Sequence, residues 1–224
     1  LTTYSDIVAA MSIDATDSSL TPFDQRIHEI RPHPGQIFVA QRICQILVDS
    51  QIVSNSSNSK RVQDPYSFRC IPQVHGPVNE SLEKLIQTVD VELNSSTDNP
   101  LIFPDVERPG SHEVMSQGNF HGEVLALVAD SMSLGLFELS SISERRIDQM
   151  LDPSRLAIQP FLASNPGLAS GLMIVQYSAA AALGELHGHA SPRTAFSTTT
   201  SAGQEDHVSM GATASWNLYE AIQR

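Results

Sequence analysis

The sequence predicts an all-α fold, a bundle of long helices. Apolar residues recur at helical spacing over long stretches, and the apolar/polar alternation that is typical of strands is nearly absent. Short polar connectors that contain Pro or Gly separate the apolar stretches. Because 224 residues are enough to bury a core, we expect residues 1–224 to form a single helical domain, incomplete on its own.

Six stretches carry the helical pattern. The second begins at Pro34, near its first turn, where a missing N–H costs little. Two connectors are expected to be flexible loops: a polar run near 54–60, and a segment near 104–117 that is rich in Pro, Gly and charge. The predicted helices cover residues 3–15, 34–51, 73–93, 119–151, 170–189 and 203–224.

The predicted helix over 119–151 is unusually long and is apolar on most of its sides. Only Gly122 and Gly135 interrupt it, and at 1.5 Å per residue it would measure about 48 Å. A helix that is apolar on most sides is a buried one. Because a chain of this size offers little to cover such a helix, we expect an oligomer.

The formal charge of −12 argues against nucleic acid or an anionic membrane surface as a partner. No stretch approaches the roughly 18 apolar residues needed to span a bilayer, so we expect no membrane association. The opening LTTYSDIVAA lacks a basic region followed by an apolar run, and a cytoplasmic protein is expected. Cys44 and Cys70 lie among apolar neighbours, as buried free thiols do.

Four segments carry polar residues that a plain helical bundle does not need. In the first, residues 63–70, Tyr66 and Arg69 stand three apart after the turn-forming pair Asp64 and Pro65. A planar guanidinium can hold a carboxylate through two hydrogen bonds, so this pattern suits carboxylate recognition. A structural ion pair is the alternative reading.

The other three segments are each ambiguous alone. Residues 97–100, Thr-Asp-Asn-Pro, are typical of an ordinary turn. The two glycines of 117–122 bracket Asn-Phe-His and would let a ligand approach the backbone, or the Asn is a helix cap and the Phe is core. Residues 204–207 place an acidic pair beside a histidine, either as a site or as a solvated first turn of a helix.

Metal and hydrolase sites are poorly supported. His187 and His189 lie two apart, so on a helix they point in different directions, and His207 beside Asp206 matches no recognised ligand spacing. The sequence also has no G-x-S-x-G motif. We therefore expect no metal site.

Taken in order, the segments resemble the histidine ammonia-lyase branch of the aromatic amino acid ammonia-lyase family. The resemblance covers about residue 20 to the C-terminus. It rests on PFDQRIHEIRPHPGQ, QDPYSFRC, PQVHG, NSSTDNPLIF, GNFHGE, ISERRI, GLMI and SAGQEDHVSMG.

This resemblance implies a mostly helical homotetramer whose active sites combine residues from three subunits. The implied reaction is non-oxidative loss of ammonia from L-histidine to give urocanate. The implied electrophile is 4-methylideneimidazole-5-one (MIO), which forms by cyclisation of an internal Ala-Ser-Gly. Carried over to this chain, Arg69 would bind the substrate carboxylate with help from Asn99, and Tyr66 and Gln63 would lie near the cofactor.

In the same carry-over, Phe120 and His121 would line the pocket, and Glu205, next to Gln204, would face the imidazole ring. A carboxylate accepts the ring N–H and stabilises positive charge on imidazole, whereas a phenyl ring offers neither interaction. The phenylalanine-type members resemble this stretch without Glu-Asp-His-Val. Glu205 therefore favours histidine as the substrate.

Several family features have no counterpart in this sequence. These are the cofactor-forming triad in its Gly-rich context, the N-terminal loop with the catalytic tyrosine, and the Asn-Gly-Thr motif. The Ala-Ser-Gly at 169–171 stands where the family has Asn-Ser-Gly and lacks the following aspartate, so we do not expect a cofactor there. Gln117 replaces a usual glycine.

The leading hypothesis is a parent histidine ammonia-lyase in which this chain supplies substrate-binding residues and is inactive when isolated. A companion N-terminal chain is one source of the missing part. The alternatives are a phenylalanine or tyrosine ammonia-lyase, an aminomutase, or a non-catalytic helical assembly module.

Overall fold

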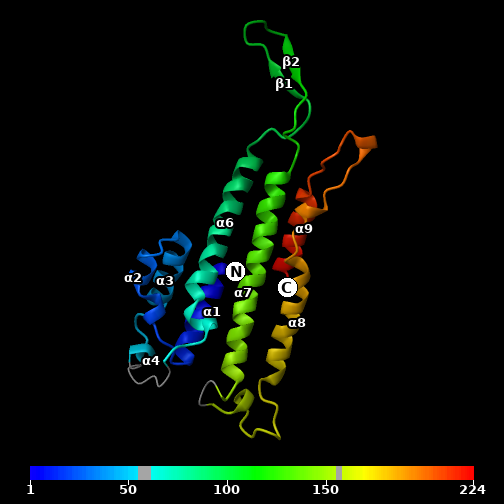
Figure 1. Ribbon diagram of the computed structural model, residues 1–224. Helices are drawn as coiled ribbons and strands as arrows, with labels where there is room; N and C mark the ends of the chain where they lie inside the picture. Colours follow the sequence, from blue (N-terminus) through cyan, green and yellow to red (C-terminus); the bar gives the residue numbers. More distant parts are fainter. Residues whose placement is uncertain (55–61, 155–157) are drawn as a thin grey trace.

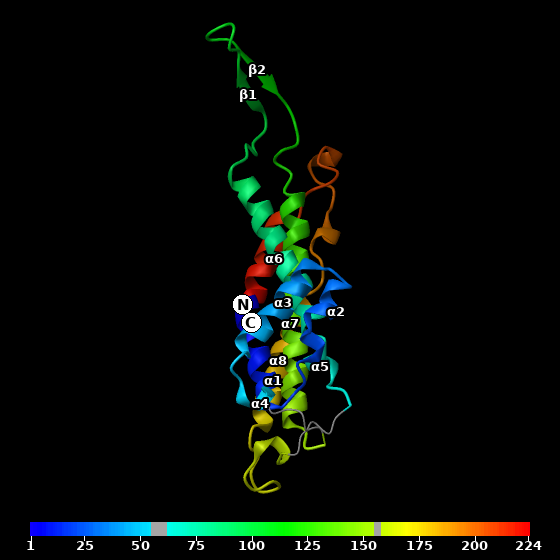
Figure 2. The ribbon, with the colours of Figure 1, turned by 90° about the vertical axis from the view of Figure 1, so that its left-hand side faces the viewer.

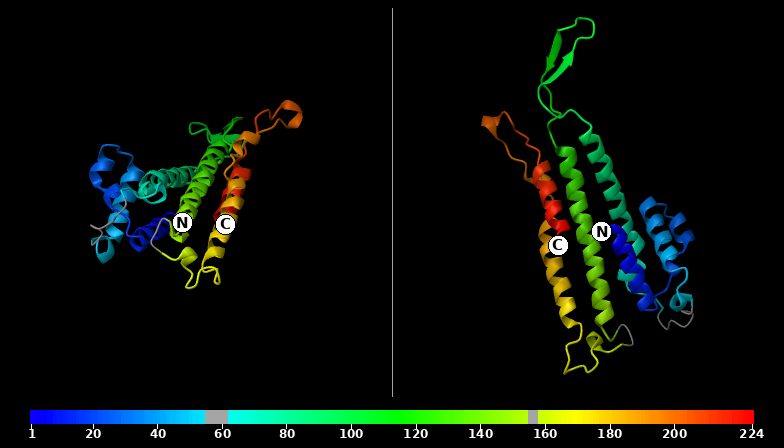
Figure 3. Two further views of the ribbon diagram at one scale, coloured as in Figure 1. Left: turned by 60° about the horizontal axis from the view of Figure 1, so that its bottom comes forward. Right: turned by 180° about the vertical axis from the view of Figure 1, so that it is seen from behind.

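The computed structural model describes residues 1–54, 62–154 and 158–224, and it confirms a mostly helical fold (Figure 1). The long helix α7 lies at the centre, with α6 on one side and α8 and α9 on the other (Figures 1 and 3). The α-helices are α1 (Thr2–Ala15), α2 (Gln25–Glu29), α3 (Pro34–Ile46), α4 (Gln51–Ser54), α5 (Tyr66–Arg69), α6 (Ile71–Leu93), α7 (Glu123–Leu151), α8 (Met173–His189) and α9 (Gly211–Ile222).

The predicted helices are present, but their ends differ from the predicted ones, by four residues or more in three cases. The helix expected to reach about residue 51 ends at Ile46, and α4 is separate. Ser50 explains the break, because its hydroxyl accepts a hydrogen bond from the Val53 amide at 3.1 Å and so caps α4. Helix α7 begins at Glu123 rather than 119, and α9 begins at Gly211 rather than 203.

The loop expected near 104–117 is in part a β-hairpin. Strands β1 (Leu101–Pro104) and β2 (His112–Met115) pair antiparallel, with Ile102 opposite Val114. Both strands are only four residues long and largely exposed, so they leave no alternating pattern in the sequence. The hairpin projects beyond the helices (Figure 2). The other expected loop, near 54–60, lies outside the described residues except for Ser54.

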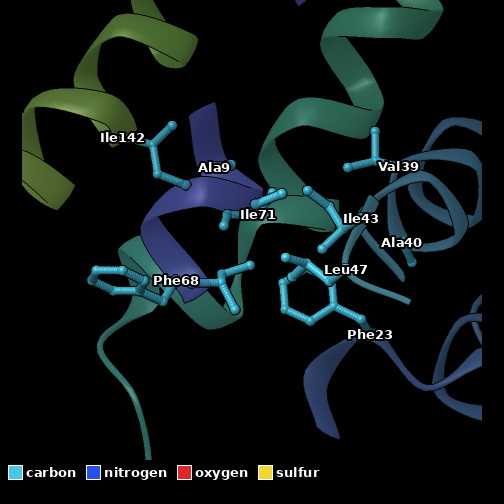
Figure 4. Packing of buried hydrophobic residues seen from close by; sticks show 11 residues of the cluster. Ala9, Phe23, Val39, Ala40, Ile43, Leu47, Phe68, Ile71 and Ile142 are labelled. Atoms are coloured by element: carbon cyan, nitrogen blue, oxygen red, sulfur yellow. The ribbon is translucent and has the colours of Figure 1, made fainter. Parts of the chain in front are cut away.

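The core consists of two clusters. One joins α1, α3, α5 and α6 and includes Ile13, Ile43, Phe68 and Ile71 (Figure 4). The other lies along α7, where α6, α8 and α9 pack on it. Each fully buried Val, Leu, Ile, Phe or Met side chain contributes about 1.5–3 kcal/mol. In the cluster along α7, the residues that this helix contributes are Ala126, Ala129, Met132, Leu136 and Leu139.

The opposite face of α7 is left exposed by the residues that the structure describes. Leu127 and Leu134 are 56% and 49% exposed, although the helix is apolar on that side too. By length and composition α7 is also the one described helix that could cross a membrane, contrary to our expectation from the sequence, and half of the relevant window is buried. The buried central helix of a bundle passes the same test, so this is weak support for a membrane role.

Helices α3 and α6 approach closely at Gly35 and Gly76. A Cβ atom added at Gly35 would lie 2.3 Å from the Gly76 carbonyl oxygen, and one added at Gly76 would lie 2.6 Å from the Gln36 amide nitrogen. These contacts are with backbone atoms, which cannot rotate away. The crossing therefore requires glycine at both positions.

A buried polar network lies between α1, α3, α6 and α7. The Asp6 carboxylate, fully buried, accepts a hydrogen bond from His75 Nδ1 at 2.7 Å and one from Arg42 Nη1 at 2.8 Å. Arg146, which is 1% exposed, interacts electrostatically with both Asp6 and His75. Burial lowers the pKa of His75, and the positive charge of Arg146 lowers it too, against the effect of the Asp6 hydrogen bond.

We predict that Gly76→Ala destabilises the fold by about 1–3 kcal/mol, because the added methyl group forces α3 and α6 apart. Chemical unfolding of the purified protein measures this. Gly118→Ala is the matched control, since a Cβ atom there would meet nothing within 4 Å. Equal stability of the two variants would contradict the close crossing.

We predict that the free energy of unfolding falls as the pH drops below about 6.5, the ordinary pKa of histidine. The folded pKa of His75 lies lower. As the pH falls, His75 is therefore protonated in the unfolded chain before it is protonated in the folded protein. The contribution of His75 to the free energy of unfolding is at its full value only above that pH. His75→Asn, which still offers Asp6 a donor, should flatten this dependence, measured by unfolding between pH 8 and 5.5. The exposed His33→Asn should retain it; an unchanged slope in His75→Asn would contradict the prediction.

Candidate active site

The first group of candidate residues lies on α5 and just before it. The guanidinium carbon of Arg69 sits 4.6 Å from the centre of the Tyr66 ring, within the range of a cation–π interaction. Tyr66 is 70% exposed, and Gln63 is also exposed. The buried Nε of Arg69 has no hydrogen-bond partner among the described residues. This nitrogen is therefore an unsatisfied donor within the part of the chain that the structure describes.

The second group lies at the base of the hairpin. Asn99 Oδ1 accepts a hydrogen bond from the backbone amide of Gln117 at 2.9 Å. The side chain of Gln117 donates from Nε2 to the Asp98 carbonyl at 2.5 Å. Gln117 thereby joins the two chain segments that enter and leave the hairpin. This contact gives the unusual glutamine a structural role at the base of the hairpin.

His121 connects this region to the segment that carries Glu205. Its Nε2 lies 2.9 Å from the His207 carbonyl oxygen, and the two imidazole rings stack with centroids 5.4 Å apart. The Gly122 amide donates to Ser209 Oγ at 3.1 Å. Phe120, which is 57% exposed, directly precedes this contact. The structure therefore brings GNFHG and QEDHVS together.

Glu205 lies in a tight loop rather than at a helix start, as we had considered. The Thr200 amide donates to the Glu205 carbonyl at 2.9 Å, and Ser201, Ala202 and Gly203 turn the chain with positive φ. The Thr200 and Ser201 hydroxyls donate to Glu205 Oε2 at 2.7 and 2.8 Å and lower the pKa of Glu205. These two hydrogen bonds therefore favour the ionised form of the carboxylate. Gln204 beside it is exposed.

Two buried polar side chains, not predicted from the sequence, anchor the segment that directly follows α8. Asp130 on α7 accepts hydrogen bonds from the Arg193 and Thr194 amides, both at 2.9 Å. Asn217 on α9 donates to the His189 carbonyl and accepts from Arg193 Nη2. A lone aspartate inside the apolar stretch of α7 was the available signal, because buried charges need partners.

The two groups of candidate residues lie at opposite ends of α6 (Figure 2). Arg69 comes just before α6 and Asn99 shortly after it, and a helix of 23 residues is about 35 Å long. One chain therefore does not bring Arg69 and Asn99 to the same carboxylate. Glu205, Phe120 and His121 lie at the Asn99 end (Figure 1).

The histidines of α8 have structural contacts. His189 Nδ1 lies 3.0 Å from Asn217 Oδ1, and the His187 ring packs 5.7 Å from that of Phe137. Within the described ranges, no three His, Cys, Asp or Glu side chains are grouped so that they could hold a metal ion.

The whole chain, residues 1–224, matches the family model described as aromatic amino acid lyase. The chain belongs to this family. Among curated relatives, the histidine ammonia-lyase of Myxococcus xanthus is 46% identical over 214 residues, which are 96% of this chain and 41% of the relative. That of Bacillus cytotoxicus is 43% identical, over 98% of this chain and 42% of the relative. This aromatic amino acid lyase chain thus spans about two fifths of these relatives.

Solved structures of the aromatic amino acid lyase family share the fold. The crystal structure of histidine ammonia-lyase from Trypanosoma cruzi has a TM-score of 0.83 at 40% identity, covering 98% of this chain and 40% of that one. Phenylalanine aminomutase of Pantoea agglomerans has a TM-score of 0.87 at 32% identity, covering 99% and 45%. The fold is therefore common to members with different named activities, and identity is higher to the histidine ammonia-lyase.

Proposed function

We propose that the protein containing these residues eliminates ammonia from L-histidine to give urocanate. The observation that carries the proposal is Glu205, a carboxylate held ionised by the Thr200 and Ser201 hydroxyls in the segment that contacts His121. Such a group accepts the imidazole N–H and stabilises positive charge on the ring. The identity of 42–46% to histidine ammonia-lyases supports the same substrate.

The proposed roles divide between the two ends of the chain. Arg69 binds the substrate carboxylate, and Tyr66 and Gln63 lie beside the reacting carbon and the cofactor. At the other end, Asn99 assists in carboxylate binding, and the residues that shape the ring pocket are Phe120, His121, Gln204 and Glu205. Since about 35 Å of α6 separates Arg69 from Asn99, a complete site takes the two groups from different subunits of a homotetramer.

The MIO group, when present, supplies the electrophile for loss of the amine. The Ala-Ser-Gly at 169–171 does not fit this role, because it forms a structural turn. The Ser170 carbonyl accepts the Met173 amide at 3.1 Å, and a Cβ at Gly171 would lie 2.4 Å from the Phe161 carbonyl oxygen. We propose that the group belongs to a segment or companion chain beyond these 224 residues, in a cytoplasmic protein.

An aromatic aminomutase or a phenylalanine or tyrosine lyase is the second candidate. The Pantoea agglomerans phenylalanine aminomutase matches the fold with a TM-score of 0.87. A panel of histidine, phenylalanine and tyrosine offered to the full-length protein separates these activities. Urocanate formation supports the histidine assignment, whereas cinnamate, coumarate or a β-amino acid would overturn it. We propose that the isolated 224 residues are an inactive assembly module. Urocanate formation by this chain alone would refute that proposal.

We predict that Glu205→Gln in the full-length protein lowers kcat/KM for histidine by about 10- to 100-fold, because a neutral amide replaces a charged acceptor. Thermal unfolding should change little, since the Glu205 side chain is exposed. The neighbouring Asp206→Asn is the matched control and should retain most of the activity. Unchanged urocanate production by Glu205→Gln would remove Glu205 from the site.

We predict that Arg69→Ala weakens histidine binding by about 2–5 kcal/mol, as expected when one partner of a buried charge pair is removed. The measurement is the KM of the full-length protein for histidine. Arg69→Lys, which keeps the charge without the planar fork, should fall between wild type and Arg69→Ala. A KM within about twofold of wild type in Arg69→Ala would show that Arg69 does not bind the carboxylate.

A further inference from the structure

Helix α5 carries Tyr66 and Arg69 but has only one turn, Tyr66–Arg69. Helix nucleation is costly, so a helix this short is not stable through its own hydrogen bonds. No side chain caps its N-terminus, where Pro65 precedes it. Contacts with other parts of the fold must therefore set the position of Tyr66 and Arg69.

Helix α5 packs against α1, α6 and α7. Phe68, 3% exposed, packs into the cluster formed with α1, α3 and α6, and so anchors one side of α5 (Figure 4). On α7, Arg146 donates from Nη1 to the Ser67 carbonyl at 3.3 Å. This carbonyl belongs to the last turn of a helix, where carbonyls lack an intrahelical partner.

The Arg146 guanidinium is itself held in place. Its Nη2 donates to Ser143 Oγ at 2.8 Å, and the Ser143 hydroxyl donates to the Leu139 carbonyl at 2.7 Å. Burial lowers the pKa of Arg146 to about 10, and the negative charge of Asp6 opposes that effect, so the group stays charged at neutral pH. A buried charge is costly unless it has partners, and here they are Asp6, the Ser67 carbonyl and Ser143.

We propose that Arg146 is a positioning residue that fixes α5 and thereby aims Arg69 at the substrate carboxylate. This inference rests on the proposed function and assigns a role to a residue that contacts no substrate. It requires the fork of arginine, because one planar group bridges the Ser67 carbonyl of α5 and Ser143 of α7. A lysine has the charge but presents one compact ammonium group and cannot reproduce both bonds.

The test uses Arg146→Lys in the full-length enzyme, with two competitive inhibitors. Urocanate carries the carboxylate, whereas histamine keeps the imidazole and the amine without it. We expect the inhibition constant of urocanate and the KM of histidine to rise about tenfold, the effect of one lost charged hydrogen bond. The inhibition constant of histamine should change less than about twofold. Equal weakening of both inhibitors, or of neither, would overturn the proposal.

Two controls separate positioning from loss of structure. Arg26→Lys makes the same change at an arginine that is 86% exposed and pairs with Asp24, and it should leave both inhibition constants unchanged. If Arg146→Lys does not fold, Ser143→Ala removes only the second bond and should shift urocanate binding in the same direction. Selective weakening of urocanate supports the proposal, and no selectivity overturns it.

A double variant tests whether Arg146 acts through Arg69. In an Arg69→Ala background, Arg146→Lys should add less than about twofold to the KM, because residues that act as one unit are not additive. Full additivity would overturn the proposal. If the wild-type enzyme deaminates phenylalanine instead of histidine, the proposed function fails; cinnamate and phenethylamine then replace urocanate and histamine, and the positioning test still decides.

Discussion

Gly135 of α7 leaves room for Val78 of α6, and around this contact the two longest helices pack side by side. A Cβ atom at Gly135 would come within 3.0 Å of the Val78 side chain. The pair acts as a rigid spacer, since α1, α3 and α5 pack near the start of α6, while the hairpin and the Glu205 loop lie near its end (Figure 1). The length of this pair, and not any single polar contact, determines which candidate residues can meet within one chain.

The helical architecture could be predicted because periodic apolar residues act locally along each helix. The apolar composition of α7 predicted a buried helix, and one face of α7 is buried in the core. The hairpin could not be predicted, since four-residue exposed strands have no buried face to impose alternation. The start of α9 was misplaced because Ser209 bonds to the Gly122 amide, 87 residues away. Interactions between distant segments are the part of the fold that a single sequence conceals.

The candidate site shows the same division. Sequence motifs identified Arg69, Asn99, His121 and Glu205 as a set. Only the structure shows that the 23 residues of α6 form one continuous helix that separates Arg69 from Asn99. The supporting residues Asp130, Arg146 and Asn217 were not predicted. Each has at least one backbone group among its partners, and a backbone partner leaves no characteristic residue type in the sequence.

The separation of the two candidate groups has a genetic consequence. If each site takes Arg69 from one subunit and Glu205 from another, a damaged copy of the gene also inactivates sites to which a normal subunit contributes. In a mixed tetramer, a chain damaged at one end would then disable one site, whereas a chain damaged at both ends would disable two. Two alleles damaged at opposite ends would, conversely, restore some sites to one another.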